Sequence, residues 1–95
     1  MIIVNKPAND TVKYVIYLGD ARFCAYAKND AEAAEAVAGY LIAIGKSDWY
    51  YDAIAVECMA KSINKNVDEF INDTDLRCCP KYNVYLPKCK IKEEN

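Results

Sequence analysis

The chain offers few residues that could perform acid–base chemistry. It has no histidine, so proton transfer near neutral pH would need a carboxylate, cysteine or lysine with a strongly shifted pKa. Asp48 and Asp52 are the most suggestive carboxylates, because a spacing of four residues places them one helical turn apart beside Trp49, Tyr50 and Tyr51. Acidic side chains are also typical of a solvated helix start, where they interact favourably with the helix dipole. We adopt this second interpretation and predict no catalytic residues and no enzymatic activity.

The cysteines do not form a recognisable metal or disulfide pattern. There are five of them, Cys24, Cys58, Cys78, Cys79 and Cys89. Zinc sites use about four ligands, commonly supplied as C-x2–4-C pairs, and this chain has no such pair. An odd number argues against a closed set of disulfides, and no histidine is present to activate a thiol. None of the three glycines lies in a phosphate-loop motif. We therefore predict reduced cysteines that act as small buried hydrophobes, with no metal and no cofactor.

The segment from Thr11 to Lys28 predicts a β-hairpin. Gly19 and Asp20 separate two runs with strand composition, and glycine in the first position suits a type II′ turn. A two-residue turn pairs Leu18 with Ala21 and Ile16 with Phe23, which makes one face wholly apolar. The opposite face then collects a mixed set: Lys13, Val15, Tyr17, Arg22, Cys24 and Tyr26.

The middle of the chain predicts three helices. The first is expected from Asp30 to Ile44, capped by Asn29 or Asp30, with Gly45 as its stop. The second is expected after a cap at Ser47 or Asp48 and to continue to Ile63, antiparallel to the first. The third is expected over Val67–Asn72, after the capping box Asn66-x-x-Glu69. The apolar stripes are Ala33, Val37, Leu41 and Ile44 in the first helix, Trp49, Ala53, Val56, Ala60 and Ile63 in the second, and Phe70 and Ile71 in the third.

These elements predict a two-layer α+β fold in which an antiparallel sheet of three or four strands carries two or three helices on one face. The hairpin 11–28 would be joined by Met1–Val4 and by Lys81–Leu86, an edge strand bounded by prolines. We predict a single domain over residues 1–88 and a frayed tail over 89–95. Because no apolar run of signal-peptide or membrane-spanning length is visible, the protein is expected to be cytoplasmic.

Charge is distributed unevenly along the chain. Residues 29–75 contain ten acidic and three basic residues, a balance of −7, whereas residues 1–28 and 76–95 carry +2 and +3. The helical layer should therefore be acidic and the sheet mildly basic. The candidate partner-binding residues on the acidic side are Asp48, Tyr50, Asp52, Asp30, Glu32 and Glu35.

Small size, a single domain, an acidic balance and eight tyrosines without a catalytic set together resemble the general character of phage-encoded anti-CRISPR proteins. This resemblance implies a small acidic inhibitor, encoded by a phage or mobile element, that blocks a nucleic-acid-handling host defence protein such as a CRISPR-Cas effector. Carboxylates would occupy a basic surface that normally holds phosphates. The expected partner is another protein, in the host cytoplasm.

A nucleic-acid-binding sheet is the alternative. Lys13, Tyr17, Arg22 and Tyr26 on the outer hairpin face, joined by Tyr85 and Lys81, could stack bases and hold phosphates. The net charge of −2 and the isoelectric point near 5.0 argue against direct nucleic-acid binding. An enzyme is a third and less favoured alternative.

Overall fold

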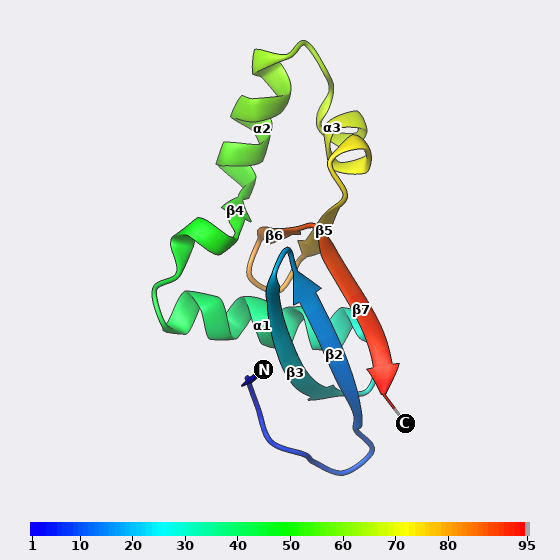
Figure 1. Ribbon diagram of the computed structural model, residues 1–95. Coiled ribbons are helices and arrows are strands. Elements are labelled where there is room, and N and C mark those ends of the chain that lie inside the picture. Colours follow the sequence, from blue (N-terminus) through cyan, green and yellow to red (C-terminus); the bar gives the residue numbers. More distant parts are fainter. Residues whose placement is uncertain (95) are drawn as a thin grey trace.

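The computed structural model describes residues 1–94, which form two sheets, three α-helices and a short 3-10 turn. The large sheet has the order β1-β3-β2-β7, with bounds Ile2–Ile3, Ala21–Ala27, Val12–Leu18 and Cys89–Glu94. The small sheet has the order β4-β6-β5, with bounds Tyr51–Asp52, Val84–Pro87 and Leu76–Cys79. Helix α1 (Asp30–Ala43) crosses the inner face of the large sheet, while α2 (Ala53–Ser62) and α3 (Val67–Asp73) extend beyond the small sheet (Figure 1). The molecule is elongated, 44 × 25 × 24 Å, and the predicted α+β class is confirmed.

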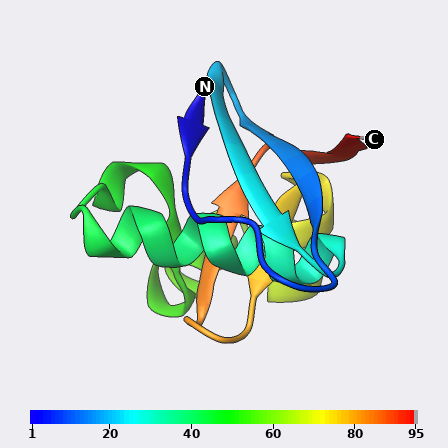
Figure 2. The ribbon, with the colours of Figure 1, turned by 90° about the horizontal axis from the view of Figure 1, so that it is seen from below.

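The β2–β3 hairpin has the predicted register. Leu18 pairs with Ala21 and Ile16 with Phe23 across the Gly19–Asp20 turn, and Gly19 adopts the positive φ of 59° that this turn requires. Ile16 and Phe23 are fully buried against α1, which lies directly beneath the strands (Figure 2). Alternation of side chains across the pleat therefore creates the main core on one face of the sheet.

Both edges of the hairpin are covered by terminal segments. Strand β1 pairs with β3 in parallel, so the large sheet is not purely antiparallel. Beyond β1, the side-chain amide of Asn5 accepts from the Tyr26 N–H at 2.7 Å and donates to the Tyr26 carbonyl at 2.9 Å. Asn5 thus continues the ladder where β1 ends.

The prediction of a frayed tail over 89–95 is wrong for residues 89–94, because they form β7; Asn95 lies outside the described residues. Strand β7 pairs antiparallel with β2 along its whole length. Ile91 lies opposite Ile16 on the core side, while Lys90 and Lys92 alternate onto the outer side. Without β7, the edge of β2 would expose unpaired backbone groups.

Helix α1 begins and ends close to the prediction. Asn29 is its N-cap, since the Asn29 Oδ1 accepts from the Glu32 N–H at 2.9 Å. Glu32 reaches back to the Lys28 N–H instead of to Asn29. Gly45 follows the helix with a φ of 73°. Ile44 is 47% exposed, and its predicted place on the apolar stripe is wrong because it is the C-cap residue, where the helical repeat has already ended.

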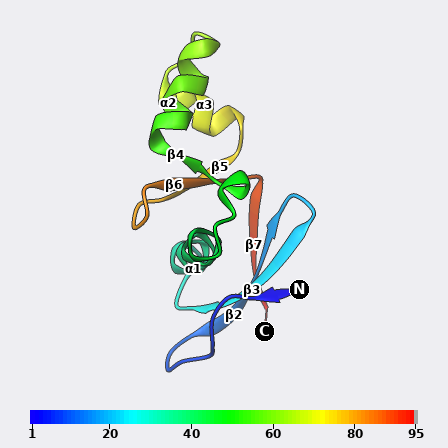
Figure 3. The same cartoon turned by 90° about the vertical axis from the view of Figure 1, so that its left-hand side faces the viewer.

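The predicted start of the second helix is also wrong. Residues Ser47–Trp49 form the 3-10 turn η1, the chain then extends through β4, and α2 starts only after Asp52. Asp52 is the N-cap, because its carboxylate accepts from the Ala55 N–H at 2.8 Å. Pairing of Tyr51 with Tyr85 of β6 redirects the chain away from α1. Helix α2 consequently packs on α3 and is not antiparallel to α1 (Figure 3).

Two core clusters result from this path. The main one lies between the large sheet, α1 and the small sheet. Trp49 belongs there and not to the α2 stripe, with its ring centroid 5.9 Å from that of Phe23 in an edge-to-face arrangement. The second cluster joins Val56 and Ala60 of α2 to Phe70 of α3. Asn66 caps α3 as predicted, since its Oδ1 accepts from the Glu69 N–H, but the Glu69 carboxylate accepts from the side-chain amide of Asn66 instead of from its backbone N–H.

The strand predicted over Lys81–Leu86 is shifted and misplaced. Residues 80–83 form a turn in which Asn83 has a φ of 55°, and β6 covers Val84–Pro87. Strand β6 is the central strand of the small sheet and not an edge. Pro87 is tolerated because it is the last residue of β6. The backbone hydrogen bond that a proline cannot donate is therefore missing only at the end of the ladder.

Candidate functional site

The predicted acidic residues do not form one site. Asp30 and Glu32 lie in the first turn of α1, with Glu35 one turn further on. Asp48 and Asp52 follow the opposite end of that helix. Because the 14 residues of α1 span about 21 Å, the group at its start and the pair Asp48 and Asp52 beyond its end lie in different regions of the surface. Tyr50, one of the predicted partner-binding residues, is half-buried against the main core, so only part of its side chain is available at the surface.

A mixed apolar and acidic surface surrounds the beginning of α2. We call it the α2-start surface, and its exposed residues are Asp48, Tyr51, Asp52, Ile54 and Glu57. Ile54 is 74% exposed, the largest value among the large hydrophobic side chains. Its exposure follows from the helix register, because Val56 and Ala60 face α3 and thereby turn Ile54 and Glu57 to solvent. The sequence prediction omitted Ile54, although the predicted stripe through Val56 and Ala60 already places Ile54 on the opposite side of the helix.

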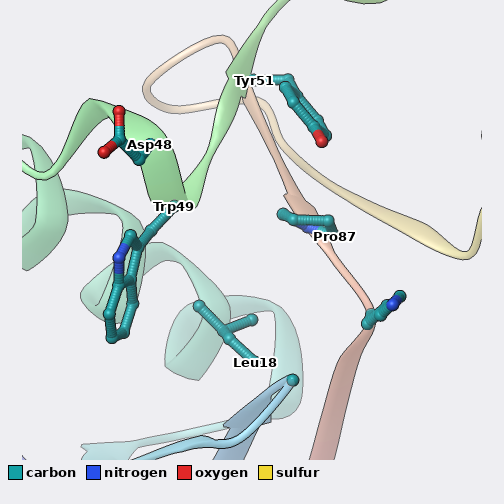
Figure 4. A pocket seen from close by; sticks show the side chains of 7 residues that line it. Leu18, Asp48, Trp49, Tyr51 and Pro87 are labelled. Carbon is teal, nitrogen blue, oxygen red and sulfur yellow. The ribbon is translucent and has the colours of Figure 1, made fainter.

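A pocket of about 280 Å³ adjoins this surface at the junction of the two sheets. Its lining comes from the hairpin turn, η1, β4 and the link between β6 and β7: Leu18, Gly19, Asp48, Trp49, Tyr51, Pro87 and Lys88. In Figure 4, Trp49 and Pro87 stand on opposite sides and Leu18 lies below them. These apolar walls suit a flat or aliphatic side chain. Asp48 and Lys88 add one group of each charge.

The walls of this pocket are held by the core and by turn geometry. Trp49 is fixed by its edge-to-face contact with Phe23. Lys88 adopts a φ of 51°, a left-handed conformation that turns the chain from the small sheet into β7. Gly19 carries no side chain, and a Cβ added there would meet no atom within 4 Å. The pocket is therefore preformed and open on the side of the hairpin turn.

The cysteines divide into two groups. Cys24 and Cys79 are buried and Cys89 is partly buried, whereas Cys58 and Cys78 are exposed, which contradicts the prediction of packing roles for the latter two. Burial raises the pKa of Cys79 to about 12 and that of Cys89 to about 11, so both are protonated near neutral pH. Among residues 1–94, no three or more potential ligands gather in a way that could hold a metal ion.

The outer face of the large sheet brings the alternative binding residues together as predicted. Tyr17 lies opposite Arg22, and Lys13 lies opposite Tyr26. Strand β7 extends the same face with Lys90 beside Tyr17 and Lys92 beside Val15. The sequence prediction missed both lysines because it treated their segment as a tail. Tyr85 and Lys81 do not join this face, since they belong to the small sheet and its turn.

Within the described part of the chain, no helix has the length and apolar character needed to cross a membrane. Comparison with protein-family models, with curated proteins and with solved structures found no match to this chain.

Proposed function

We propose that this protein is a binding inhibitor, which blocks a nucleic-acid-handling protein by covering a basic surface of that target. The main support for this proposal is the α2-start surface, where Ile54 is 74% exposed and belongs to the same surface as Asp48, Asp52 and Glu57. An exposed aliphatic side chain near the carboxylates at the start of a helix complements an apolar patch bordered by Arg and Lys. In this proposal the protein acts by occupancy and not by turnover.

The pocket beside the α2-start surface supports the same proposal. An arginine side chain of the target could stack on the indole of Trp49, which lines the pocket, while the carboxylate of Asp48 points away from Trp49 and Leu18 (Figure 4). Stacking of a guanidinium on an indole contributes about 0.5–2 kcal/mol. Aromatic and arginine residues in preformed pockets are the usual centres of binding energy at protein interfaces.

The proposed target class follows from this complementarity. Basic, arginine-rich surfaces on proteins commonly bind phosphate backbones, and an acidic ligand competes with nucleic acid for them. The proposal therefore groups the protein with anti-CRISPR and other anti-defence proteins of phages and mobile elements, acting in the host cytoplasm on an effector such as a CRISPR-Cas complex.

The test is a competition experiment with matched variants. Immobilised protein is used to capture its target from host extract, and purified target is then titrated with labelled nucleic acid in the presence of the inhibitor. Asp48→Lys with Asp52→Asn changes the charge by about +3 while keeping a residue able to cap α2. Asp30→Lys with Glu32→Gln makes the same change in charge at the far end of α1.

The first pair should weaken binding by about 10- to 100-fold, as expected for charged groups that meet Arg or Lys across an interface, and the control pair should change it little. Ile54→Ala should also weaken binding. A target whose nucleic-acid binding is unaffected by the inhibitor would refute the proposed mechanism. If both charge variants lost the same amount of affinity for the target, the α2-start surface would not be the binding site.

A further inference from the structure

We propose that the outer face of the large sheet, which contains none of the residues of the α2-start surface, binds single-stranded nucleic acid. The register defines this face in cross-strand rows. One row runs Arg22, Tyr17, Lys90, the next contains Cys24, Val15, Lys92, and the third runs Tyr26, Lys13, Glu94. Two tyrosines and four basic side chains therefore lie on one sheet face, with strands about 5 Å apart.

The positive charge of this face is largely free to meet a ligand. Lys13 forms an ion pair with Glu94 at 3.3 Å. Among residues 1–94, no ion pair engages Arg22, Lys90 or Lys92. The face thus has a local excess of positive charge although the whole chain carries −2, because ten of the fourteen acidic residues lie in residues 29–75, outside the strands of the large sheet. Electrostatic attraction at contact range depends on this local distribution more than on the net charge.

A hollow of about 420 Å³ continues the face at the hairpin turn. It is lined by Tyr17, Gly19, Asp75, Lys88 and Lys90. A partly exposed tyrosine that lines the hollow together with two lysines suits a nucleobase stacked on Tyr17 with its phosphate near Lys88 or Lys90. Asp75, the one acidic residue among those that line the hollow, can accept a hydrogen bond from a base amino group.

The arrangement favours a single strand over a duplex or an acidic protein. Bases in a duplex are stacked on one another, so they cannot reach Tyr17 or Tyr26, whereas single strands expose them. An acidic protein would satisfy the lysines but would leave Tyr17 and Tyr26 without a planar partner. Tyrosines with interleaved lysines and arginine on an open sheet face match the combination that binds unpaired bases and phosphates together.

The experiment uses fluorescence anisotropy with labelled oligothymidylate and oligouridylate of about 12 nucleotides. If Arg22, Lys88, Lys90 and Lys92 each neutralise one phosphate, affinity should fall about 50-fold between about 50 mM and about 200 mM salt. Lys90→Gln with Lys92→Gln should reduce this salt effect to about sevenfold. Lys46→Gln with Lys61→Gln, an equal change in charge away from the sheet, should leave it unchanged.

Tyr17→Leu should weaken binding about fivefold or more without altering the salt effect, because it removes stacking alone. Circular dichroism verifies that each variant is folded. Comparison of the DNA and RNA arms distinguishes the two sources of the ligand, and binding in either supports the proposal.

Three outcomes would overturn it: no salt-dependent binding of either oligonucleotide, equal binding of heparin with no effect of Tyr17→Leu, or equal losses in the control variant. Binding of duplex DNA in preference to the single strand would refute the assigned ligand. Asp48→Lys with Asp52→Asn should bind the oligonucleotides at least as well as the wild type, so failure of this proposal is separable from failure of the inhibitor proposal.

Discussion

Replacement of Phe23 by alanine is the most informative perturbation of the fold. Phe23 is fully buried, and its ring makes edge-to-face contacts with Tyr40 at 6.4 Å and with Trp49 at 5.9 Å between centroids. Truncation of a buried phenylalanine to alanine costs about 3–5 kcal/mol, because transfer free energy is lost and a cavity remains. Since domains of this size are stable by about 5–15 kcal/mol, the variant should fold but with a small margin.

Urea unfolding monitored by tryptophan fluorescence measures this loss. Trp49 is the only tryptophan and contacts Phe23 directly, so its emission reports on the affected part of the core. With an m-value of about 2 kcal/mol per molar urea, a loss of about 4 kcal/mol lowers the midpoint by about 2 M. Arg22→Ala is the matched control, because it is one position away on the exposed face and should change stability by less than about 0.5 kcal/mol.

The charged pair of variants sharpens the same test. Phe23→Asp should abolish folding, since it places a carboxylate opposite Ile16 in the core, whereas Arg22→Asp should fold. Equal midpoints for Phe23→Ala and Arg22→Ala, or a larger loss for the arginine variant, would refute the hairpin register and the assignment of the core face.

Further predictions concern the corrected parts of the structure and the buried thiol of Cys79. Asp52→Ala should lower stability by about 1 kcal/mol through loss of the α2 cap, whereas Asp48→Ala and Asp52→Asn should not, as thermal unfolding would show. Ile91→Asp should destabilise strongly while Lys92→Asp is tolerated, and equal unfolding temperatures would contradict the pairing of β7 with β2. A thiol reagent should modify Cys58 and Cys78 quickly in the native protein and all five cysteines in denaturant. Burial raises the pKa of Cys79 to about 12 from an ordinary 9.0, so the unfolded state loses that proton at lower pH than the folded state. Stability should therefore fall as pH rises above about 9. In a Cys79→Ala variant, the urea midpoint should decrease less over the same pH range.

The sequence predicted the elements whose signals are local. The β2–β3 register follows from Gly19 and from strict alternation, since a slip by one residue would expose Ile16 and Phe23. The N-caps at Asn29 and Asn66 follow from side chains that bond the backbone three residues later. The outer hairpin face was predicted as well, because partners across a known register share a side.

The start of α2 could not be decided from local preference. Ser47, Asp48 and Asp52 are all good capping residues, and the sequence alone gives no reason to prefer the last. The choice depends on the pairing of Tyr51 with Tyr85, two residues that are 34 positions apart in the chain. This pairing extends the backbone between Asp48 and Asp52, so the two carboxylates do not lie one helical turn apart, and α2 begins after Asp52 with Ile54 exposed.

The fate of the C-terminal segment was likewise decided by tertiary structure. Residues 89–94 carry four charges and only two apolar side chains, a composition that does not by itself indicate a strand. They order because β2 offers an unpaired edge and because Ile91 reaches the core opposite Ile16. The sequence thus determined which residues prefer to be buried and which can cap a helix. Only long-range pairing determined that β7 forms along the free edge of β2, which places Lys90 and Lys92 on the outer face.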